Sequence, residues 1–146
     1  MKLRINAIIR SFDGFTGKTT KITKVHNLIV NSGLEQVAKI IGKLSTGFDY
    51  LAIGTDNTSP TNSDVSLGTE VEREQASVSY VADYKVKFDK TFSVGSGVSH
   101  TVVEAGIFDS ATESGSIMLN RLTFDAHVLN SDNPLQVIIT ITVSRS

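Results

Sequence analysis

Hydrophobic and polar residues alternate along most of this chain, which is the period of a β-strand that buries one of its faces. The alternation is clearest over residues 78–88, where the even-numbered positions are Val78, Tyr80, Ala82, Tyr84, Val86 and Phe88. Similar patterns, bounded by turn residues, predict strands over these ranges: 3–10, 19–25, 50–53, 101–108, 118–124 and 135–143. The chain therefore reads as a succession of half-buried antiparallel strands.

One segment follows the spacing of a helix instead. Its apolar residues recur at three- and four-residue intervals: Leu34, Val37, Ala38, Ile41 and Leu44. We therefore predict an amphipathic helix over residues 32–43. Ser32 and Glu35 have the spacing of a capping box, in which each side chain bonds the free backbone N–H of the other residue. Gly42 or Gly47 can end the helix.

The pattern as a whole predicts a mainly β protein. We expect an antiparallel β-sandwich or jelly-roll-like arrangement, with the single helix across one open end or side. The even-numbered positions of 78–88 and the odd-numbered positions of 135–143 are expected to line its inner walls. A chain of 146 residues and 15.7 kDa has the size of one domain, so residues 1–146 are interpreted as a single β-rich unit.

Composition and charge narrow the classes of function. The alternation over Met1–Arg10 indicates a strand rather than a signal peptide, and the sequence holds no apolar run long enough for a membrane span. The net charge of −1 gives the chain no strong electrostatic attraction to polyanions, so neither nucleic acid nor a membrane is expected as a partner. Because the sequence has no cysteine, disulfides and cysteine-containing metal sites are excluded.

The segment 55–66 (TDNTSPTNSDVS) is too polar to belong to a core. Its Asp, Asn, Ser, Thr and Pro residues predict a loop, and the length of this loop favours a functional or interface role. We expect Asp56, Asn57, Thr58 and Asn62 to be exposed contact residues in it.

The sequence contains no convincing catalytic constellation. Gly17-Lys18-Thr19 matches the end of a phosphate-binding loop, but Phe12 occupies the position of its first glycine, so a hairpin turn is the preferred interpretation. The histidines at 26, 100 and 127 lie far apart, without the spacing of metal ligands. We therefore expect the chain not to be an enzyme, and we assign no catalytic residue, metal or cofactor.

Three blocks of residues have a familiar order and spacing. They are HNLIVNSGL at 26–34; YLAIGT at 50–55 with Pro60, Asp64, Leu67, Glu70 and Arg73 after it; and EAGIFD at 104–109 with Arg121 and Phe124 after it. Together they resemble a family of small structural proteins of tailed bacteriophages and prophages, described as tail fibre or minor virion proteins. The chain departs from that family at Asp56, where the family has a glycine, and at Val65, where it has a threonine.

The resemblance implies assembly rather than catalysis. It suggests a virion component of the tail fibre or baseplate that is made in the host cytoplasm and forms homo-oligomers, with a trimer favoured by analogy with fibres. Its partners would be other virion proteins, and it could contact a glycan of the host surface.

Two alternatives stay open at this point. A capsid decoration or head-fibre protein needs the same compact β domain but attaches to the shell. A carbohydrate-binding or calcium-dependent adhesion module would carry its site on loop 55–66. The calcium version requires at least some of the carboxylates of Asp56, Asp64 and Glu70 to converge, although the loop lacks the spacing of an EF-hand and a solvated loop is preferred.

Overall fold

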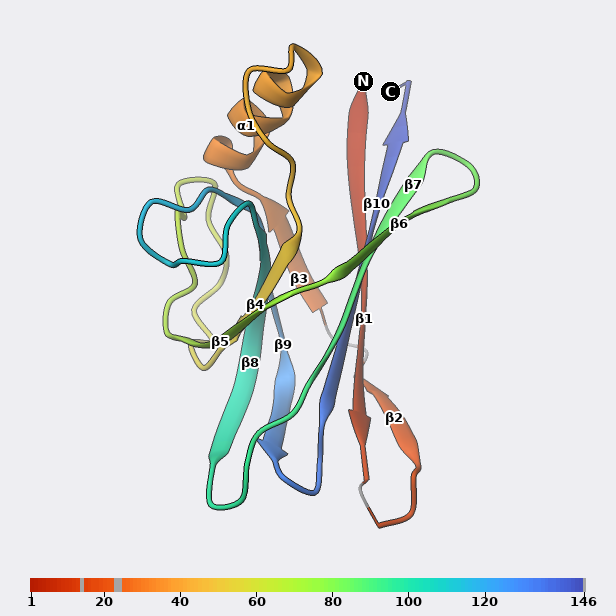
Figure 1. Ribbon diagram of the computed structural model, residues 1–146, viewed down its shortest axis with the longest axis vertical. Helices are drawn as coiled ribbons and strands as arrows, with labels where there is room; N and C mark the ends of the chain where they lie inside the picture. Colours follow the sequence, from red (N-terminus) through yellow and green to blue (C-terminus); the bar gives the residue numbers. More distant parts are fainter. Residues whose placement is uncertain (14, 23–24, 146) are drawn as a thin grey trace.

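The computed structural model describes residues 1–13, 15–22 and 25–145 (Figure 1). Along these ranges the elements are β1 (Lys2–Phe12), β2 (Thr19–Ile22), β3 (Val25–Ile29), α1 (Asn31–Ile41), β4 (Tyr50–Gly54), β5 (Glu70–Gln75), β6 (Ser77–Val81), β7 (Lys85–Phe92), β8 (Ser99–Phe108), β9 (Met118–Asn130) and β10 (Leu135–Ser144). Strands make up 54% of the structure and helix 8%, which confirms the prediction of a mainly β protein with a single helix.

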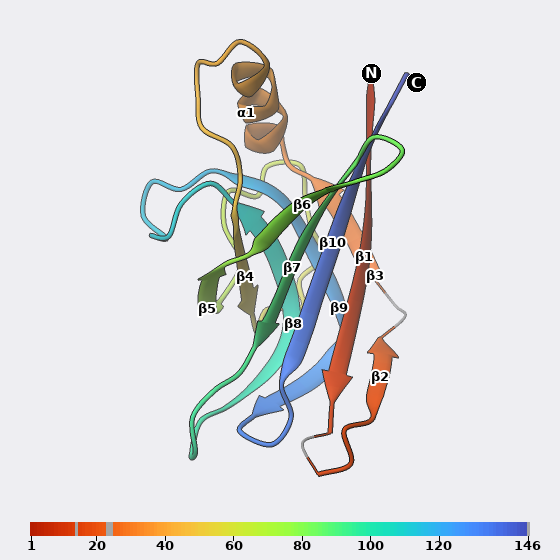
Figure 2. The same ribbon diagram turned by 45° about the vertical axis from the view of Figure 1, so that its right-hand side comes forward.

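The strands form two antiparallel sheets that pack against each other (Figures 1 and 2). The first sheet has the order β2-β1-β10-β7-β6, and the second has the order β3-β9-β8-β4-β5. The main core lies between them and includes Ile9, Leu51, Ile53, Phe88, Phe92, Ile107, Leu122, Leu135, Val137, Ile139 and Ile141. The odd-numbered positions of β10 up to Ile141 therefore face the core, as the alternation predicts.

Contacts between the two sheets partly close both sides of the sandwich. Only Ala76 separates β5 from β6, yet these strands belong to different sheets. On that side, Lys90 of β7 forms an ion pair with Glu74 of β5, with 2.5 Å between Nζ and Oε2. On the other side, the Asn27 amide of β3 donates a hydrogen bond to the Ile5 carbonyl of β1 at 3.5 Å.

The prediction of one strand over 78–88 is wrong. The segment is a hairpin of β6 and β7, closed by the pair Val81 and Lys85. Asp83 and Tyr84, in the turn, have positive φ angles of 64° and 65°. The alternation of hydrophobic and polar residues cannot reveal such a turn. Non-glycine residues rarely adopt this backbone conformation, so nothing in the residue types marks the turn. Phe88 is buried as predicted, whereas Tyr80 and Tyr84 are 74% and 73% exposed.

Other strands also differ from the prediction, and β9 runs on to Asn130 rather than ending at 124. The range 19–25 belongs to two strands of different sheets, β2 and β3, and residues 23–24 lie outside the described ranges. The hydrophobic pattern also misses β5, because four of its six residues are charged.

The helix begins at Asn31, with Val30 as its N-cap residue, and Gly42 follows its last residue as predicted. The predicted capping box does not form, because the helix starts one residue before Ser32. The Ser32 hydroxyl instead donates to the Met118 carbonyl at 3.4 Å, and Glu35 pairs with Lys39 at 2.6 Å. Within the described ranges, no helix is long and apolar enough to cross a membrane.

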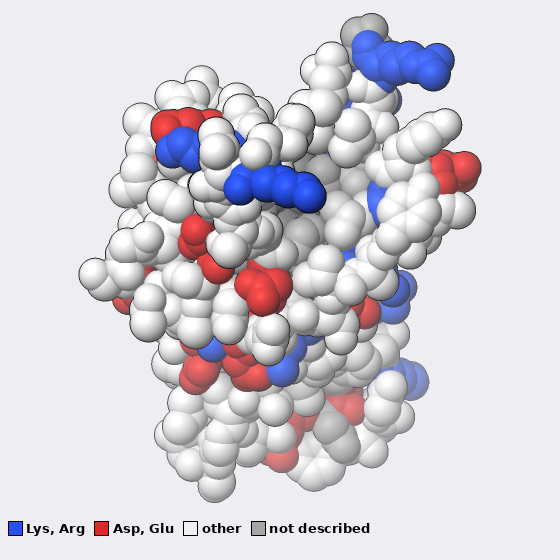
Figure 3. Space-filling view, turned by 45° about the horizontal axis from the view of Figure 1, so that its top comes forward, with Lys and Arg blue, Asp and Glu red and all other residues white. Residues whose placement is uncertain are grey.

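Only part of the apolar stripe of α1 faces the core. Val37 packs against the main core, while Leu34 and Ile41 are 49% and 70% exposed. The buried residues of the helix are Gly33, which packs on Leu119 of β9, and Gln36, whose amide donates to Ser45, Thr46 and Asp109. The stripe also lines an open groove of about 620 Å³ against the ends of β1 and β3. Figure 3 shows the molecule hollowed at this end, beside the chain termini and the β6–β7 hairpin.

The approach of α1 to β9 requires a glycine at position 33, because an added Cβ would overlap the Leu119 carbonyl. We expect Gly33→Ala to destabilise the protein by about 1–3 kcal/mol, although alanine has the higher helix propensity. Urea unfolding measures the difference. Gly47→Ala is the control, because nothing lies within 4 Å of a Cβ added there. Equal unfolding midpoints for the two variants would contradict this account of the packing.

Candidate functional site

A buried ion pair lies on the face of the second sheet that points away from the first. Glu104 on β8 and Arg121 on β9 are 0% and 3% exposed, and Arg121 Nε donates to Glu104 Oε2 at 2.8 Å. Two loops cover this face, residues 55–69 and 109–117, so residues 102–108 of β8 and 118–124 of β9 are buried on both sides. A smaller hydrophobic cluster fills the space beneath them: Val30, Ala52, Leu67, Phe108 and Met118.

The Glu104 carboxylate holds both ends of loop 55–69. It accepts hydrogen bonds from the backbone N–H groups of Asp56 at 3.2 Å, Gly68 at 3.0 Å and Thr69 at 2.8 Å. With the guanidinium of Arg121, four donors surround this carboxylate. Such saturation is what allows a charged group to be buried without a prohibitive desolvation cost.

Arg121 connects the same ion pair to the middle of the loop. Its Nη1 donates to the Asp64 carboxylate at 3.1 Å, and its Nη2 donates to the Asp56 carbonyl at 3.3 Å. Asp64 also accepts hydrogen bonds from the Thr61 N–H at 3.0 Å and the Thr61 hydroxyl at 2.6 Å. Partial burial raises the pKa of Asp64, but the bonds from Thr61 and Arg121 outweigh this effect and hold the pKa below 3.8.

The predicted contact residues all lie in this clamped loop. Asn57, Thr58 and Asn62 are exposed, as expected. Asp56, by contrast, is only partly exposed. Its side chain turns back and accepts the Thr58 hydroxyl at 2.6 Å and the Thr58 N–H at 2.8 Å, and these bonds lower its pKa. The Asn62 carbonyl accepts the Asn31 N–H at 2.9 Å and so ties the loop to the start of α1.

A second ion pair fastens the other loop. Arg73 and Glu70, both on β5, form a bidentate pair with two N–O distances of 2.7 Å. The Nη1 of Arg73 donates to the carbonyls of Ser110 and Thr112, each at 3.0 Å, and its guanidinium lies 3.9 Å from the centre of the Phe108 ring. One cation thus fixes loop 109–117 to the edge of the second sheet.

The carboxylates considered for a calcium site are each bound by other groups of the chain. Asp64 binds Arg121, Glu70 binds Arg73, and Asp56 accepts hydrogen bonds from Thr58. Among the residues that the structure describes, no group of three or more His, Asp or Glu side chains is placed to hold a metal ion.

The other sequence candidates have local roles. Residues 17–19 belong to the β1–β2 hairpin, where the Gly17 N–H donates to the Asp13 carbonyl at 2.8 Å, so the hairpin interpretation is confirmed. His127 Nε2 lies 3.3 Å from the Asn133 carbonyl, and burial lowers the pKa of this histidine. The side chain of His26 lies outside the described part of the chain.

Alternation and composition do not single out the Glu104–Arg121 and Glu70–Arg73 pairs. The family resemblance nevertheless points to these residues. Asp64, Glu70 and Arg73 belong to the second block of the resemblance, and Glu104 and Arg121 belong to the third. The structure assigns them mutual contacts, and every buried side-chain N or O atom among the described residues has a hydrogen-bond partner.

Comparison with known proteins finds no matching family model, no matching curated protein and no matching solved structure. The role of the chain is therefore inferred from its own residues.

Glu104→Gln tests whether the buried carboxylate holds the loop. A glutamine amide nitrogen would meet one of the surrounding N–H donors whichever way it turned, and Arg121 would lose part of its compensating charge. We expect a loss of about 3–5 kcal/mol in the free energy of unfolding. Glu113→Gln removes the same charge at an exposed position of loop 109–117 and should change stability little. Equal losses in the two variants would show that the pair is not structural.

Asp64 predicts a dependence of stability on pH. Its folded pKa lies below the ordinary value of 3.8, so its contribution is present above that value and is lost as the pH falls through the folded pKa. Asp64→Asn should therefore unfold at lower temperature at neutral pH, and the difference from wild type should shrink below pH 3.8. Thermal unfolding followed by circular dichroism measures both effects. Asp125→Asn, at an exposed position of β9, is the control, and a constant difference at all pH values would contradict the prediction.

Proposed function

We propose that the chain is a non-enzymatic structural protein of a tailed-phage virion, located at the tail fibre or baseplate and acting through assembly with other virion proteins and with copies of itself. The observation that carries this proposal is the convergence of the three sequence blocks. Residues 26–34, 50–73 and 104–124 are distant in sequence, yet they form one unit around the second sheet.

Each block contributes contacts to that unit. Gly33 of the first block packs on the Leu119 carbonyl, and Arg73 of the second block binds the carbonyls of Ser110 and Thr112. Glu104 and Arg121 of the third block clamp the loop of the second. The residues that carry the resemblance therefore determine the shape of the domain, which is what related assembly proteins would share.

The chemistry of the cluster suits a scaffold. The carboxylates of Glu104, Asp64 and Glu70 bind arginines and backbone N–H groups of their own chain. This arrangement holds loop 55–69 in one conformation and leaves Asn57, Thr58 and Asn62 at the surface. A rigid, polar and weakly charged loop is suited to contact with a neighbouring virion protein or with a glycan.

Immunogold electron microscopy tests the proposed location. Particles are induced from cultures of the organism that encodes the chain, and are labelled with an antibody raised against the chain. The matched control is the same culture with the coding sequence deleted. We expect gold at the tail or its tip in the first preparation, and none in the control.

The other outcomes count against the proposal in different degrees. Gold distributed over the head would replace the tail assignment with capsid decoration. Reproducible absence of label from every particle, with the chain recovered only from the cell lysate, would overturn the virion role and favour a cellular binding module.

A further inference from the structure

The sandwich has four sheet edges, and three of them are short, charged or covered. The edge strand β2 has only four residues. β3 lies beside β1, to which Asn27 donates its hydrogen bond. β5 is largely charged and pairs irregularly with β4 at Gly54. These features are the usual means by which proteins prevent their edge strands from pairing with other chains.

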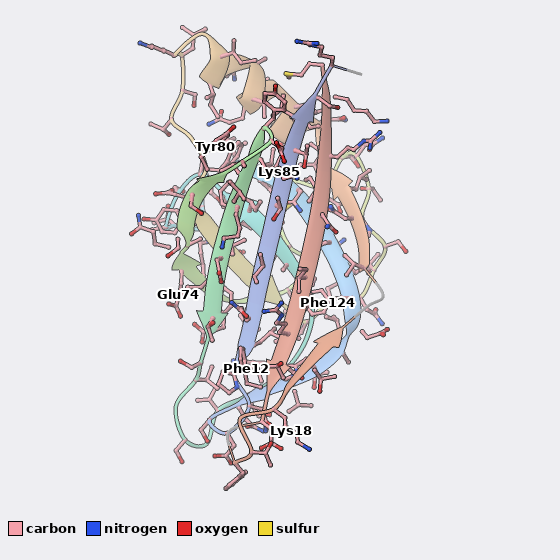
Figure 4. The ribbon with its side chains drawn as sticks, turned by 90° about the vertical axis from the view of Figure 1, so that its right-hand side faces the viewer. Phe12, Lys18, Glu74, Tyr80, Lys85 and Phe124 are labelled. Carbon is pink, nitrogen blue, oxygen red and sulfur yellow. The ribbon has the colours of Figure 1, made fainter. Side chains whose placement is uncertain are left out.

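The fourth edge, β6, is also short, with five residues, but in the described part of the chain it is neither charged nor covered. Its residues, Ser77-Val-Ser-Tyr-Val81, include no charge and no proline, and all five are exposed. In the described part of the chain, β6 pairs with β7 alone, so its other side presents free backbone donors and acceptors. Figure 4 labels Tyr80 on this strand, at the margin of the first sheet.

We propose that β6 is the interface between two copies of this chain, which pair antiparallel across a two-fold axis at Ser79. Antiparallel pairing is the arrangement in which an edge strand can hydrogen-bond to an identical strand with two-fold symmetry. The two five-stranded first sheets then become one continuous sheet.

The side chains of β6 are complementary in this register. With Ser79 opposite itself, Val78 lies opposite Tyr80 of the second copy, and Ser77 lies opposite Val81. Val78 and Tyr80 are on the same face of the sheet, since they pair with Phe88 and Val86 of β7. Aromatic and β-branched residues form favourable cross-strand pairs. Two such pairs would cover the side chains of Val78 and Tyr80, which are 43% and 74% exposed.

The hairpin holds this edge in a fixed position. The Val143 N–H of β10 donates to the Tyr84 carbonyl at 3.0 Å, and the Tyr84 N–H donates to the Tyr80 hydroxyl at 3.4 Å. The turn residues Asp83 and Tyr84 therefore keep their positive φ angles with support from the neighbouring strand. A preorganised edge loses less conformational entropy when a partner binds.

The free edge at β6 carries apolar side chains that a second copy can cover. Val78 and Tyr80 of β6 are 43% and 74% exposed, and Tyr84 in the hairpin turn is 73% exposed. Because β6 is uncharged, two copies can approach along it without repulsion between like charges at the contact.

This inference goes beyond the proposed virion role and does not depend on it. A two-fold pair also differs from the trimer suggested by analogy with fibres. The oligomeric state of the purified chain can therefore contradict the β6 interface while the location of the protein in a particle is tested separately.

Disulfide trapping tests the register directly. Because the chain has no cysteine, Ser79→Cys introduces a single thiol, which can form a disulfide only with another copy. Under mild oxidation we expect this variant to become predominantly a covalent dimer that reducing agent reverses. Thr20→Cys, at an exposed position of the opposite edge strand β2, is the matched control and should remain monomeric in the denaturing gel.

A second variant tests the interface without a cross-link. Ser79→Lys places two like charges opposite each other on the two-fold axis at an exposed position, so it should convert a dimer to a monomer in light-scattering chromatography while the thermal unfolding of the monomer stays intact. A wild-type chain that is monomeric at its highest soluble concentration, or equal cross-linking of the Ser79→Cys and Thr20→Cys variants, overturns the proposal. A trimer that Ser79→Lys leaves unchanged also overturns it.

Discussion

The structure depends on the requirement that a carboxylate withdrawn from water be surrounded by donors. Glu104 is fully buried, so the chain around it must supply hydrogen bonds, and three of the four come from backbone N–H groups of loop 55–69. This requirement also explains Gly54, because a Cβ there would overlap the Glu104 carboxylate. The loop is thus ordered by a charge beneath it rather than by a hydrophobic core of its own.

The two sheets differ because only one of them is covered on its second face. The second sheet is enclosed by the first on one side and by loops 55–69 and 109–117 on the other, and residues 102–108 of β8 are all buried. The first sheet alternates along β10 between buried odd-numbered positions and partly exposed even-numbered ones up to Ile141. One sheet therefore fixes the loops, while the other offers a broad polar face and an open edge.

The sequence predicts what depends on local periodicity and misses what depends on distant partners. Alternation predicts β10 well, because this strand buries every second residue up to Ile141. Strands β1, β4 and β8 also lie close to their predicted ranges, although β4 and β8 are buried at consecutive positions. Alternation fails at 78–88, where Tyr84 continues the pattern through a turn with a left-handed backbone. It also fails for β5, whose Arg73 is held by Glu70 and by carbonyls nearly forty residues away. The amphipathic stripe of α1 correctly indicates a helix. The stripe does not predict how closely the helix packs on β9, because that approach depends on the absence of a side chain at Gly33.

The pairing of β1 with β10 has a consequence for how the chain folds. Lys2 lies opposite Ser144 and Ser11 lies opposite Leu135, so the centre of the first sheet joins the two ends of the sequence. Contacts between such distant segments require the closure of long loops, which slows folding relative to helical proteins of similar size. During synthesis β1 must wait for β10, and the isoleucine-rich strand is open to wrong partners until β10 has been made.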